Sequence, residues 1–348
     1  MERLGAWQNL APDAIGTVKS VVIGGLRASL AHVSEGHEPA GYSVLRSDLD
    51  LALMQAAEAS GATSLQGWRL LSLSIPACDR ETELTLQGPH GEQETLRAKL
   101  VIGADGAHSR IARRSTRVQV IPRLQRVAVI THWRNASGPR DSIEMRVRGG
   151  VVCGMGFPGG EDRANVTFVA PLDRSSEIAG RPGAWAEQML AEHFPEAADR
   201  LSGAGAPESV QTAGCFAHYC RPPAADGVLL AGDAATFVDP FTGEGVYFAL
   251  RGAEMAAEAA SAALHAGDTS MRMLGAYVTA RKELTRRYLL CGAVQAVVRQ
   301  PYLLASALSR LASCPAAAAR LLRVLGDMRP PEDLLSPSFL WTLVTPVP

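Results

Sequence analysis

The hydrophobic pattern is most informative in residues 227–257, which read GVLLAGDAATFVDPFTGEGVYFALRGAEMAA. Residues 228–231 form a short apolar run of strand length, which Gly232 and Asp233 end abruptly. An acid at the carboxyl end of a strand, followed by a glycine-entered helix, is typical of the place where an α/β sheet holds a nucleotide-like cofactor. The Asp233 carboxylate can accept hydrogen bonds from sugar-like hydroxyls, and the helix amides can face a partly negative ring oxygen. Helical spacing predicts an apolar face made of Ala249, Leu250, Ala253, Ala256, Ala257 and Ala260.

In the rest of the chain, alternating apolar residues predict strands, and apolar residues that recur every three to four positions predict helices. Pro301 and Pro315 separate the last helices from one another, because proline cannot continue a helix that precedes it. The expected strands lie in 17–30, 42–45 and 71–86 and throughout 118–220, and the expected helices are 47–60, 184–193 and short helices within 284–326.

Size and composition are those of an ordinary multi-domain globular protein. The chain has 348 residues, of which 47% are hydrophobic and 20% charged, with a net charge of −1. Nothing in this charge balance indicates nucleic-acid binding. Apolar runs stay below the roughly 18 residues of a membrane span, and no signal peptide opens the chain, so a cytoplasmic location is expected. Basic residues are almost all arginine, which is typical of a GC-rich bacterial source.

The six cysteines are scattered without CxxC pairs. Cys215 and Cys220 lie on either side of His218, but GCFAHYC alternates like a strand, and a zinc site needs about four ligands held together. We therefore expect free thiols and no metal site.

The string GDAA…DPFTGEGVYFAL resembles the flavin-contacting motif of the geranylgeranyl reductase group, which belongs to the flavoprotein class of para-hydroxybenzoate hydroxylase. The resemblance implies that Asp233 binds the ribityl chain of FAD and that the loop 240–246 lies against the isoalloxazine ring. It implies that the residues that contact the cofactor are Gly232, Asp233, Pro240, Gly243, Gly245 and Val246.

A second motif lies roughly 125 residues upstream. LVIGADGAHSRIAR, residues 100–113, is similar to the Asp-Gly motif of the same class and implies that Asp105 and Gly106 bind the cofactor. The segment that starts at Arg46 and continues with Asp50 and Leu53 resembles the family's R-x-x-x-D-x-x-L pattern, whose arginine lies near FAD. The alternative is that Arg46 is a surface arginine at a helix start, where a cation is unfavourable.

The glycine-rich GxGxxG unit that holds the FAD pyrophosphate in this class is not found in the sequence. Gly154, Gly156 and Gly159 fit the pattern, but Pro158 lies inside the turn and a β-like segment follows, so no helix is expected there. MERLGAW at the start of the chain resembles a helix that follows the dinucleotide unit in the family. We therefore expect the chain as written to retain FAD weakly or not at all.

Together these patterns predict an α/β fold: an incomplete FAD/NAD(P)-binding Rossmann-like domain, an inserted, mostly antiparallel β substrate domain and C-terminal helices. The expected domains are 1–116 (partial FAD-binding domain with a β excursion at 17–40), 117–222 (substrate domain), 223–285 (FAD-binding domain) and 286–348 (C-terminal helices).

The segment VVCGMGFPGG resembles the family's aromatic-x-FP strand, which lies on the substrate side of the flavin, and it implies that Phe157 and Pro158 contact substrate. Cys153 and Met155 stand where the reductases usually carry Tyr and Trp, which puts a preference for prenyl lipids in doubt. The Trp-rich form of this segment, which flavin halogenases need, is missing. His132 in the same domain is interpreted as structural.

Glu244 is the one candidate catalytic acid, because burial beside the ring would raise its pKa and make it a proton donor. The alternative is that Glu244 only stabilises the helix start. The string GEGVYFALR follows the reductase pattern, whereas hydroxylases usually carry G-Q-G-x-N at this point.

The sequence thus predicts an FAD-dependent oxidoreductase that reduces C=C bonds of an apolar, prenyl-lipid-like small molecule. A nicotinamide, NAD(P)H, or a ferredoxin-like protein is the expected electron donor. The alternatives are an FAD-dependent monooxygenase and a non-catalytic protein that binds a lipid or a partner. Residues 284–326 carry six arginines and no acid, which suits peripheral contact with the inner membrane face; arginines in water on packed helices are the alternative.

Overall fold

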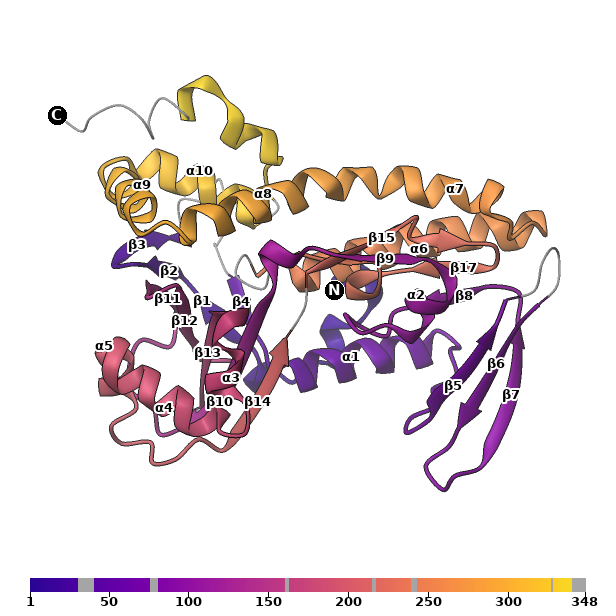
Figure 1. Cartoon of the computed structure of the whole chain (residues 1–348), viewed down its shortest axis with the longest axis horizontal. Coiled ribbons are helices and arrows are strands. Elements are labelled where there is room, and N and C mark those ends of the chain that lie inside the picture. The colour runs from indigo at the N-terminus through magenta and orange to yellow at the C-terminus, as the bar shows by residue number, and fades with distance from the viewer. Residues whose placement is uncertain are drawn as a thin grey trace. The chain divides into compact units, whose positions relative to one another are not determined.

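The computed structural model describes residues 1–30, 41–75, 81–159, 163–214, 217–238, 243–326 and 328–339 (Figure 1). The chain divides into two compact units. Unit 1 contains residues 1–64, 126–215 and 296–348, and unit 2 contains residues 65–125 and 216–295. These units group the chain differently from the four functional domains expected from the sequence, and that expected division stays a prediction.

Unit 1 is built on a seven-stranded sheet in which every neighbouring pair is antiparallel except β11 and β2. Alternating apolar residues place one face of its central strands in a core with Phe168, Trp185 and Phe194. The strand order is β14 (Ser209–Gly214), β10 (Arg126–Arg134), β13 (Arg163–Pro171), β12 (Val151–Gly156), β11 (Ser142–Arg148), β2 (Ser20–Ile23) and β3 (Leu26–Ser29).

The helices of unit 1 cover this sheet and extend from it. In Figure 1, α4 lies beside β10 and β14 with α5 next to it, while α9 lies over β3. A two-stranded pair leads into the first helix. These elements are β1 (Gly16–Val18), β4 (Gly41–Ser43), α1 (Arg46–Ala59), α3 (Ser175–Ile178), α4 (Pro182–His193), α5 (Pro195–Arg200), α9 (Pro301–Ser313) and α10 (Pro315–Leu325).

Unit 2 holds three three-stranded sheets and the longest helices. The sheets are β16 (Ala224–Ala225), β17 (Val228–Leu230) and β8 (Val101–Gly103); β5 (Arg69–Ser74), β6 (Thr82–Gln87) and β7 (Gln93–Ala98); and β18 (Thr236–Phe237), β15 (His218–Arg221) and β9 (Arg117–Val120). The helices are α2 (Arg110–Ser115), α6 (Gly245–Ala266), α7 (Met271–Ala280) and α8 (Lys282–Val298), of which the last runs three residues past the end of the unit.

The expected α/β fold with a mostly antiparallel sheet and C-terminal helices is confirmed. Pro301 and Pro315 stand at the first positions of α9 and α10, as expected, because a helix start tolerates proline. Gly154 and Gly156 lie in β12, Gly159 follows that strand, and the next element in the described residues is the strand β13, as expected for a glycine string that does not open a helix.

Two expectations about helices were wrong. The region 118–220 contains α3 and α5 besides α4, because Pro195 starts a further helix directly after α4 ends. In α6, the alanines 249, 253 and 257 are exposed, and the buried face is rotated from the expected one. The two large side chains of the buried face, Phe248 and Met255, point into the core and so fix which side of the helix is buried. The buried positions are Phe248, Gly252, Met255, Ala256, Ala260 and Ala263.

Candidate cofactor site

The two motifs found far apart in the sequence end on neighbouring strands of unit 2. Strands β8 and β17 are parallel, with Leu230 opposite Gly103, and the Ala231 amide donates to the Gly103 carbonyl at 2.9 Å. Parallel strands end at the same edge of a sheet, so Asp105 and Asp233 both follow the carboxyl ends of adjacent strands. This edge is where open α/β sheets bind their ligands.

The turn that carries Asp233 contains one glycine, Gly232, and packs against another, Gly252 on α6. Gly232 has φ = +55°, which favours glycine, and a Cβ there would lie 3.4 Å from the Cβ of Ala249 on α6. A Cβ at Gly252 would in turn lie 3.4 Å from the Gly232 amide nitrogen. Small residues on both sides thus let α6 approach the Gly232–Ala234 turn closely.

Asp105 holds the start of α2. One carboxylate oxygen accepts a hydrogen bond from the Ser109 hydroxyl, and the other accepts from the Arg110 amide at 2.7 Å. Ser109 itself caps the helix by accepting from the Ala112 amide at 2.8 Å. Gly106 has φ = +79°, and a Cβ there would meet nothing within 4 Å. The structure shows the capping role of Asp105, while its expected contact with a cofactor stays a prediction.

The N-terminus of α6 presents an open face. Gly243 has φ = +73°, and a Cβ at Gly243 or at Gly245 would meet none of the described residues within 4 Å, while Val246 is 38% exposed. Helix amides without internal partners lie at such an end. Such amides favour a group with a partly negative oxygen. Pro240, the other expected contact of this loop, lies outside the described residues.

Glu244 is buried and bound to α8. Its carboxylate accepts a hydrogen bond of 2.8 Å from Arg287 and one of 3.0 Å from the Cys291 thiol. Arg287 also lies over the Tyr247 ring, 5.1 Å from its centroid. The side chain makes no capping hydrogen bond to α6, so its observed link is to the neighbouring helix. Sequence reasoning missed Arg287 and Cys291, although their spacing of four residues places them on one face of a helix.

In unit 1 the structure brings the start of α1 near the Phe157–Pro158 segment. The Ser43 hydroxyl donates to the Phe157 carbonyl at 2.9 Å, and the Gly159 amide donates to the Ser43 carbonyl. Arg46 begins α1 with an exposed side chain that pairs with Asp50 through two hydrogen bonds of 3.1 Å. Its expected place near the cofactor stays a prediction.

Phe157 itself is packed in the core of unit 1. It is 3% exposed, and Arg140 lies over its ring at 5.2 Å from the centroid. Cys153 and Met155 lie in the same core because alternate residues of a strand share a face. Pro158 is half-buried. The proposed substrate contacts of Phe157 and Pro158 therefore remain predictions.

His132 and Trp133 point to opposite faces of β10. The Trp133 indole is buried and donates to Thr131 at 2.8 Å. His132 bonds Ser209 through Nδ1 at 3.0 Å and Asn165 through Nε2 at 3.1 Å. Among the described residues, no group of three or more His, Cys, Asp or Glu side chains is arranged to hold a metal ion.

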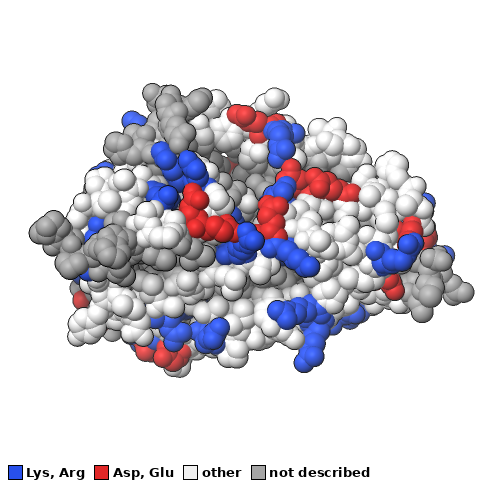
Figure 2. Space-filling model, turned by 90° about the horizontal axis from the view of Figure 1, so that it is seen from above, with Lys and Arg blue, Asp and Glu red and all other residues white. Residues whose placement is uncertain are grey.

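Charges of both signs lie side by side on the face shown in Figure 2, with uncharged surface between them. This mixture agrees with the net charge of −1. A continuous basic stripe, the usual footprint of a nucleic-acid-binding protein, is not seen on this face.

The sequence of residues 1–290 matches the family described as FAD binding domain. The chain belongs to this family. Its cofactor is FAD. The resemblance to geranylgeranyl reductases is confirmed by the relatives described next.

A digeranylgeranylglycerophospholipid reductase from Methanoculleus marisnigri is 29% identical over 278 residues, covering 73% of this chain and 62% of that protein. The chain thus spans about three fifths of the length of the curated relatives it matches. A geranylgeranyl bacteriochlorophyll reductase-like protein from Thermoplasma acidophilum has a similar structure, with a TM-score of 0.73 and 20% identity, covering 94% of this chain and 83% of that one.

The flavin-dependent halogenase CmlS also shares the fold, with a TM-score of 0.69 and 22% identity, covering 82% of this chain and 54% of that one. Likeness at this identity shows the fold alone. The bacterial source expected from the composition stays a prediction.

Proposed function

We propose that this protein is an FAD-dependent reductase that saturates C=C bonds in the isoprenoid chains of a lipid. The observation that carries the proposal is the pairing of β8 with β17, which brings both flavin motifs to one sheet edge beside the open N-terminus of α6. The named activity of the relative from Methanoculleus marisnigri supports the substrate class.

FAD, when bound, supplies the hydride for the reduction. Asp233 would accept hydrogen bonds from the ribityl hydroxyls of bound FAD, and the amides at Gly245 and Val246 would stabilise negative charge on its ring. Gly232 lets α6 pack close to the turn that carries Asp233. Asp105 accepts a hydrogen bond from the Arg110 amide and thereby fixes the start of α2 at the sheet edge formed by the ends of β8 and β17. The proton that completes each reduction is proposed to come from water, while Glu244, paired with Arg287 and bonded to Cys291, holds the start of α6 against α8.

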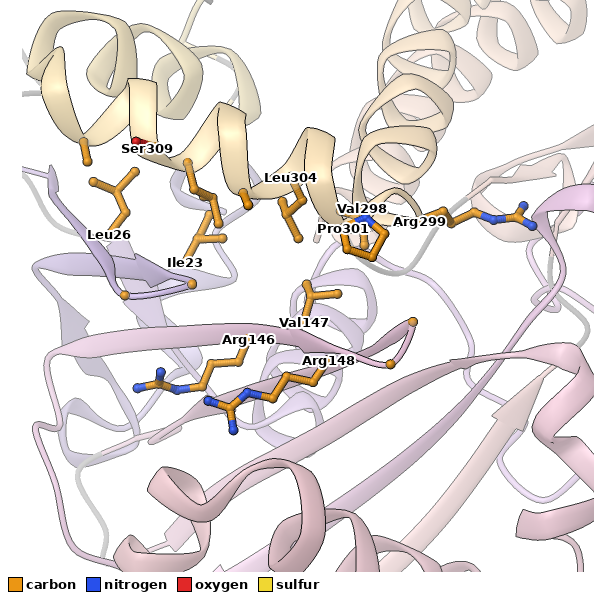
Figure 3. A pocket seen from close by; sticks show the side chains of 17 residues that line it. Ile23, Leu26, Arg146, Val147, Arg148, Val298, Arg299, Pro301, Leu304 and Ser309 are labelled. Carbon is orange, nitrogen blue, oxygen red and sulfur yellow. The ribbon is translucent and has the colours of Figure 1, made fainter. Parts of the chain in front are cut away.

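An apolar cavity in unit 1 suits a hydrocarbon chain. It has a volume of about 730 Å³ and lies between the β2–β3 hairpin, the end of β11 and helix α9 (Figure 3). Ile23, Leu26, Val147 and Leu304 face into it, whereas the side chains of Arg146 and Arg148 point away. Arg148 donates to the His193 carbonyl and to Glu196 instead. We assign this cavity to an apolar portion of the substrate.

The test of the function is product formation. Because FAD is expected to bind this chain weakly, FAD is kept in large excess over the protein, the flavin is reduced with dithionite, and vesicles containing a geranylgeranyl lipid are added. We expect lipid masses that rise by about 2 Da for each reduced bond, and Asp233→Ala to abolish this product. NADPH-dependent oxygen consumption with a hydroxylated product would instead favour a monooxygenase. A folded protein that binds the lipid but no FAD would support the non-catalytic alternative.

The cavity assignment has its own test. Ala305→Trp on α9 would fill the cavity, and we expect it to raise KM for the long-chain lipid while leaving FAD affinity unchanged. Ser306→Trp, at the next position and outside the cavity lining, is the matched control. Equal KM values for the two variants would contradict the assignment.

The peripheral membrane contact is a further part of the proposal. Helix α9 exposes Tyr302 by 90% and Leu303 by 57%, in a segment with no acidic residue from 284 to 326. Exposed aromatic and aliphatic groups beside arginines bind anionic interfaces. None of the helices in the described part of the chain combines the length and the apolar character needed to span a bilayer. Co-sedimentation with phosphatidylglycerol vesicles should weaken in Leu303→Ser and persist in Leu51→Ser, an exposed leucine on α1.

A further inference from the structure

Arg281 is a buried cation of unit 2 that the proposed chemistry does not use. It follows α7 directly, and only 6% of the residue is exposed. Its guanidinium donates to the hydroxyls of Tyr277 and Tyr288, each at 3.2 Å, and to that of Thr236 at 3.4 Å. Among the described residues no carboxylate forms an ion pair with it. A buried guanidinium without a carboxylate partner lowers the stability of the folded protein, so its presence indicates a function that Arg281 serves.

The partners of Arg281 hold both sides of the Gly232–Ala234 turn. The Tyr277 hydroxyl donates to the carbonyl of Leu230, the last residue of β17 before the turn. Thr236 begins β18, one residue after the turn ends. One guanidinium therefore joins the chain entering the turn to the chain leaving it.

The Arg281 guanidinium also lies close to the Gly232–Ala234 turn. A Cβ on Gly252 would lie 3.1 Å from Nη1 of Arg281 and 3.4 Å from the Gly232 amide nitrogen. The glycine on α6 thus leaves room for the cation next to the turn.

Tyr288 lies within electrostatic reach of both Arg281 and Asp233. Burial raises the pKa of Tyr288, Arg281 lowers it, and the negative charge of Asp233 raises it. The phenol therefore stays protonated and lies in the fields of the cation and the acid.

We propose that Arg281 is the positioning residue for Asp233: through Tyr277, Tyr288 and Thr236 it fixes the Gly232–Asp233 turn and orients the carboxylate toward the cofactor's hydroxyls. This inference rests on the proposed binding of FAD by Asp233.

The test is a double-mutant cycle on FAD affinity, with the visible spectrum of the bound flavin as a second readout. We expect Arg281→Met to weaken FAD binding at least tenfold and to shift the flavin bands, and Arg281→Lys to restore part of the affinity. In an Asp233→Asn background, Arg281→Met should change the affinity by less than twofold. Arg272→Met is the control, because this arginine of α7 has an 86% exposed side chain paired with Asp268.

Each outcome decides one of the two proposals. If Asp233→Asn leaves FAD affinity unchanged, the proposed site falls, and this inference with it. If Asp233→Asn weakens binding but Arg281→Met does not, or if the two losses simply add, only the role of Arg281 is overturned. Should Arg281→Met fail to fold, Tyr288→Phe removes one of its partners, and we expect about threefold weaker FAD binding; unchanged affinity there would overturn the inference.

Discussion

Arg287 on α8 donates a hydrogen bond of 2.8 Å to Glu244 at the start of α6, and the two side chains are only 6% and 3% exposed. This buried ion pair ties the proposed flavin-facing helix terminus to a helix more than 40 residues later in the chain. Because both charges are removed from water, loss of either side chain leaves the other charge buried without compensation and destabilises the protein.

Removal of one partner of this pair should destabilise unit 2 strongly. Arg287→Met leaves the Glu244 carboxylate buried without its cation, and we expect a loss of about 3–5 kcal/mol in the free energy of unfolding. The double variant Glu244→Leu with Arg287→Met should lose less, because no unpaired charge remains. Urea unfolding followed by circular dichroism measures both.

An exposed pair provides the comparison. Arg251 and Glu283 form an ion pair with side chains 31% and 55% exposed, and Glu283→Gln should cost less than about 1 kcal/mol. Similar losses for Glu283→Gln and Arg287→Met would show that burial does not govern the strength of the Glu244 pair.

Gly232→Ala should destabilise the turn after β17 by about 1–2 kcal/mol, because the left-handed conformation at φ = +55° is unfavourable for a residue with a Cβ. The added methyl would also contact Ala249 at 3.4 Å, and because the strained turn carries Asp233, FAD affinity should fall as well. Gly275→Ala within α7, where a Cβ meets nothing, should instead stabilise by about 0.5–1 kcal/mol. Thermal unfolding of both variants checks the opposite signs.

The buried thiols should resist alkylation in the native protein. Burial raises the pKa of Cys153 to about 12 and that of Cys220 to about 11, so almost no thiolate is present at pH 8. Cys314 is half-buried and should react with iodoacetamide before the three other cysteines of the described residues, which are buried. Peptide mass spectrometry after brief labelling measures the order, and labelling in urea should abolish the difference. Early labelling of Cys153 in the folded protein is incompatible with its place in the core.

His132 should make the stability of unit 1 depend on pH. Burial first, and then the charge of Arg163, lower the pKa of His132 below its ordinary 6.5. Thr167 donates to the Asn165 carbonyl oxygen, which turns the Asn165 amide toward Nε2 and suits a neutral imidazole. Between the lowered pKa and 6.5 the unfolded chain binds more protons, so stability falls as the pH drops below about 6.5.

The measurement is the urea midpoint at pH 7 and at pH 5.5. His132→Gln should reduce the difference between the two midpoints, whereas His265→Gln, an exposed histidine of α6, should leave it as in the parent. An unchanged difference in His132→Gln would assign the pH dependence to other groups.

Local patterns in the sequence determined the elements and the two flavin motifs. The apolar run before Gly232, the helix after Gly245 and the helices that start at Pro301 and Pro315 depend on neighbours within a few residues, so periodicity and proline chemistry predict them. The family resemblance adds the prediction that Asp105 and Asp233 both bind the cofactor.

Tertiary structure decided what those residues touch. Only the pairing of β8 with β17 places Asp105 and Asp233 at one sheet edge, and only packing turns Phe248 rather than Ala249 into the core. The bonds of Glu244 to Arg287 and of Arg281 to Thr236 join residues more than 40 positions apart. Periodicity cannot predict such contacts, because they depend on how buried charges and helices share the space between elements that are distant in the chain.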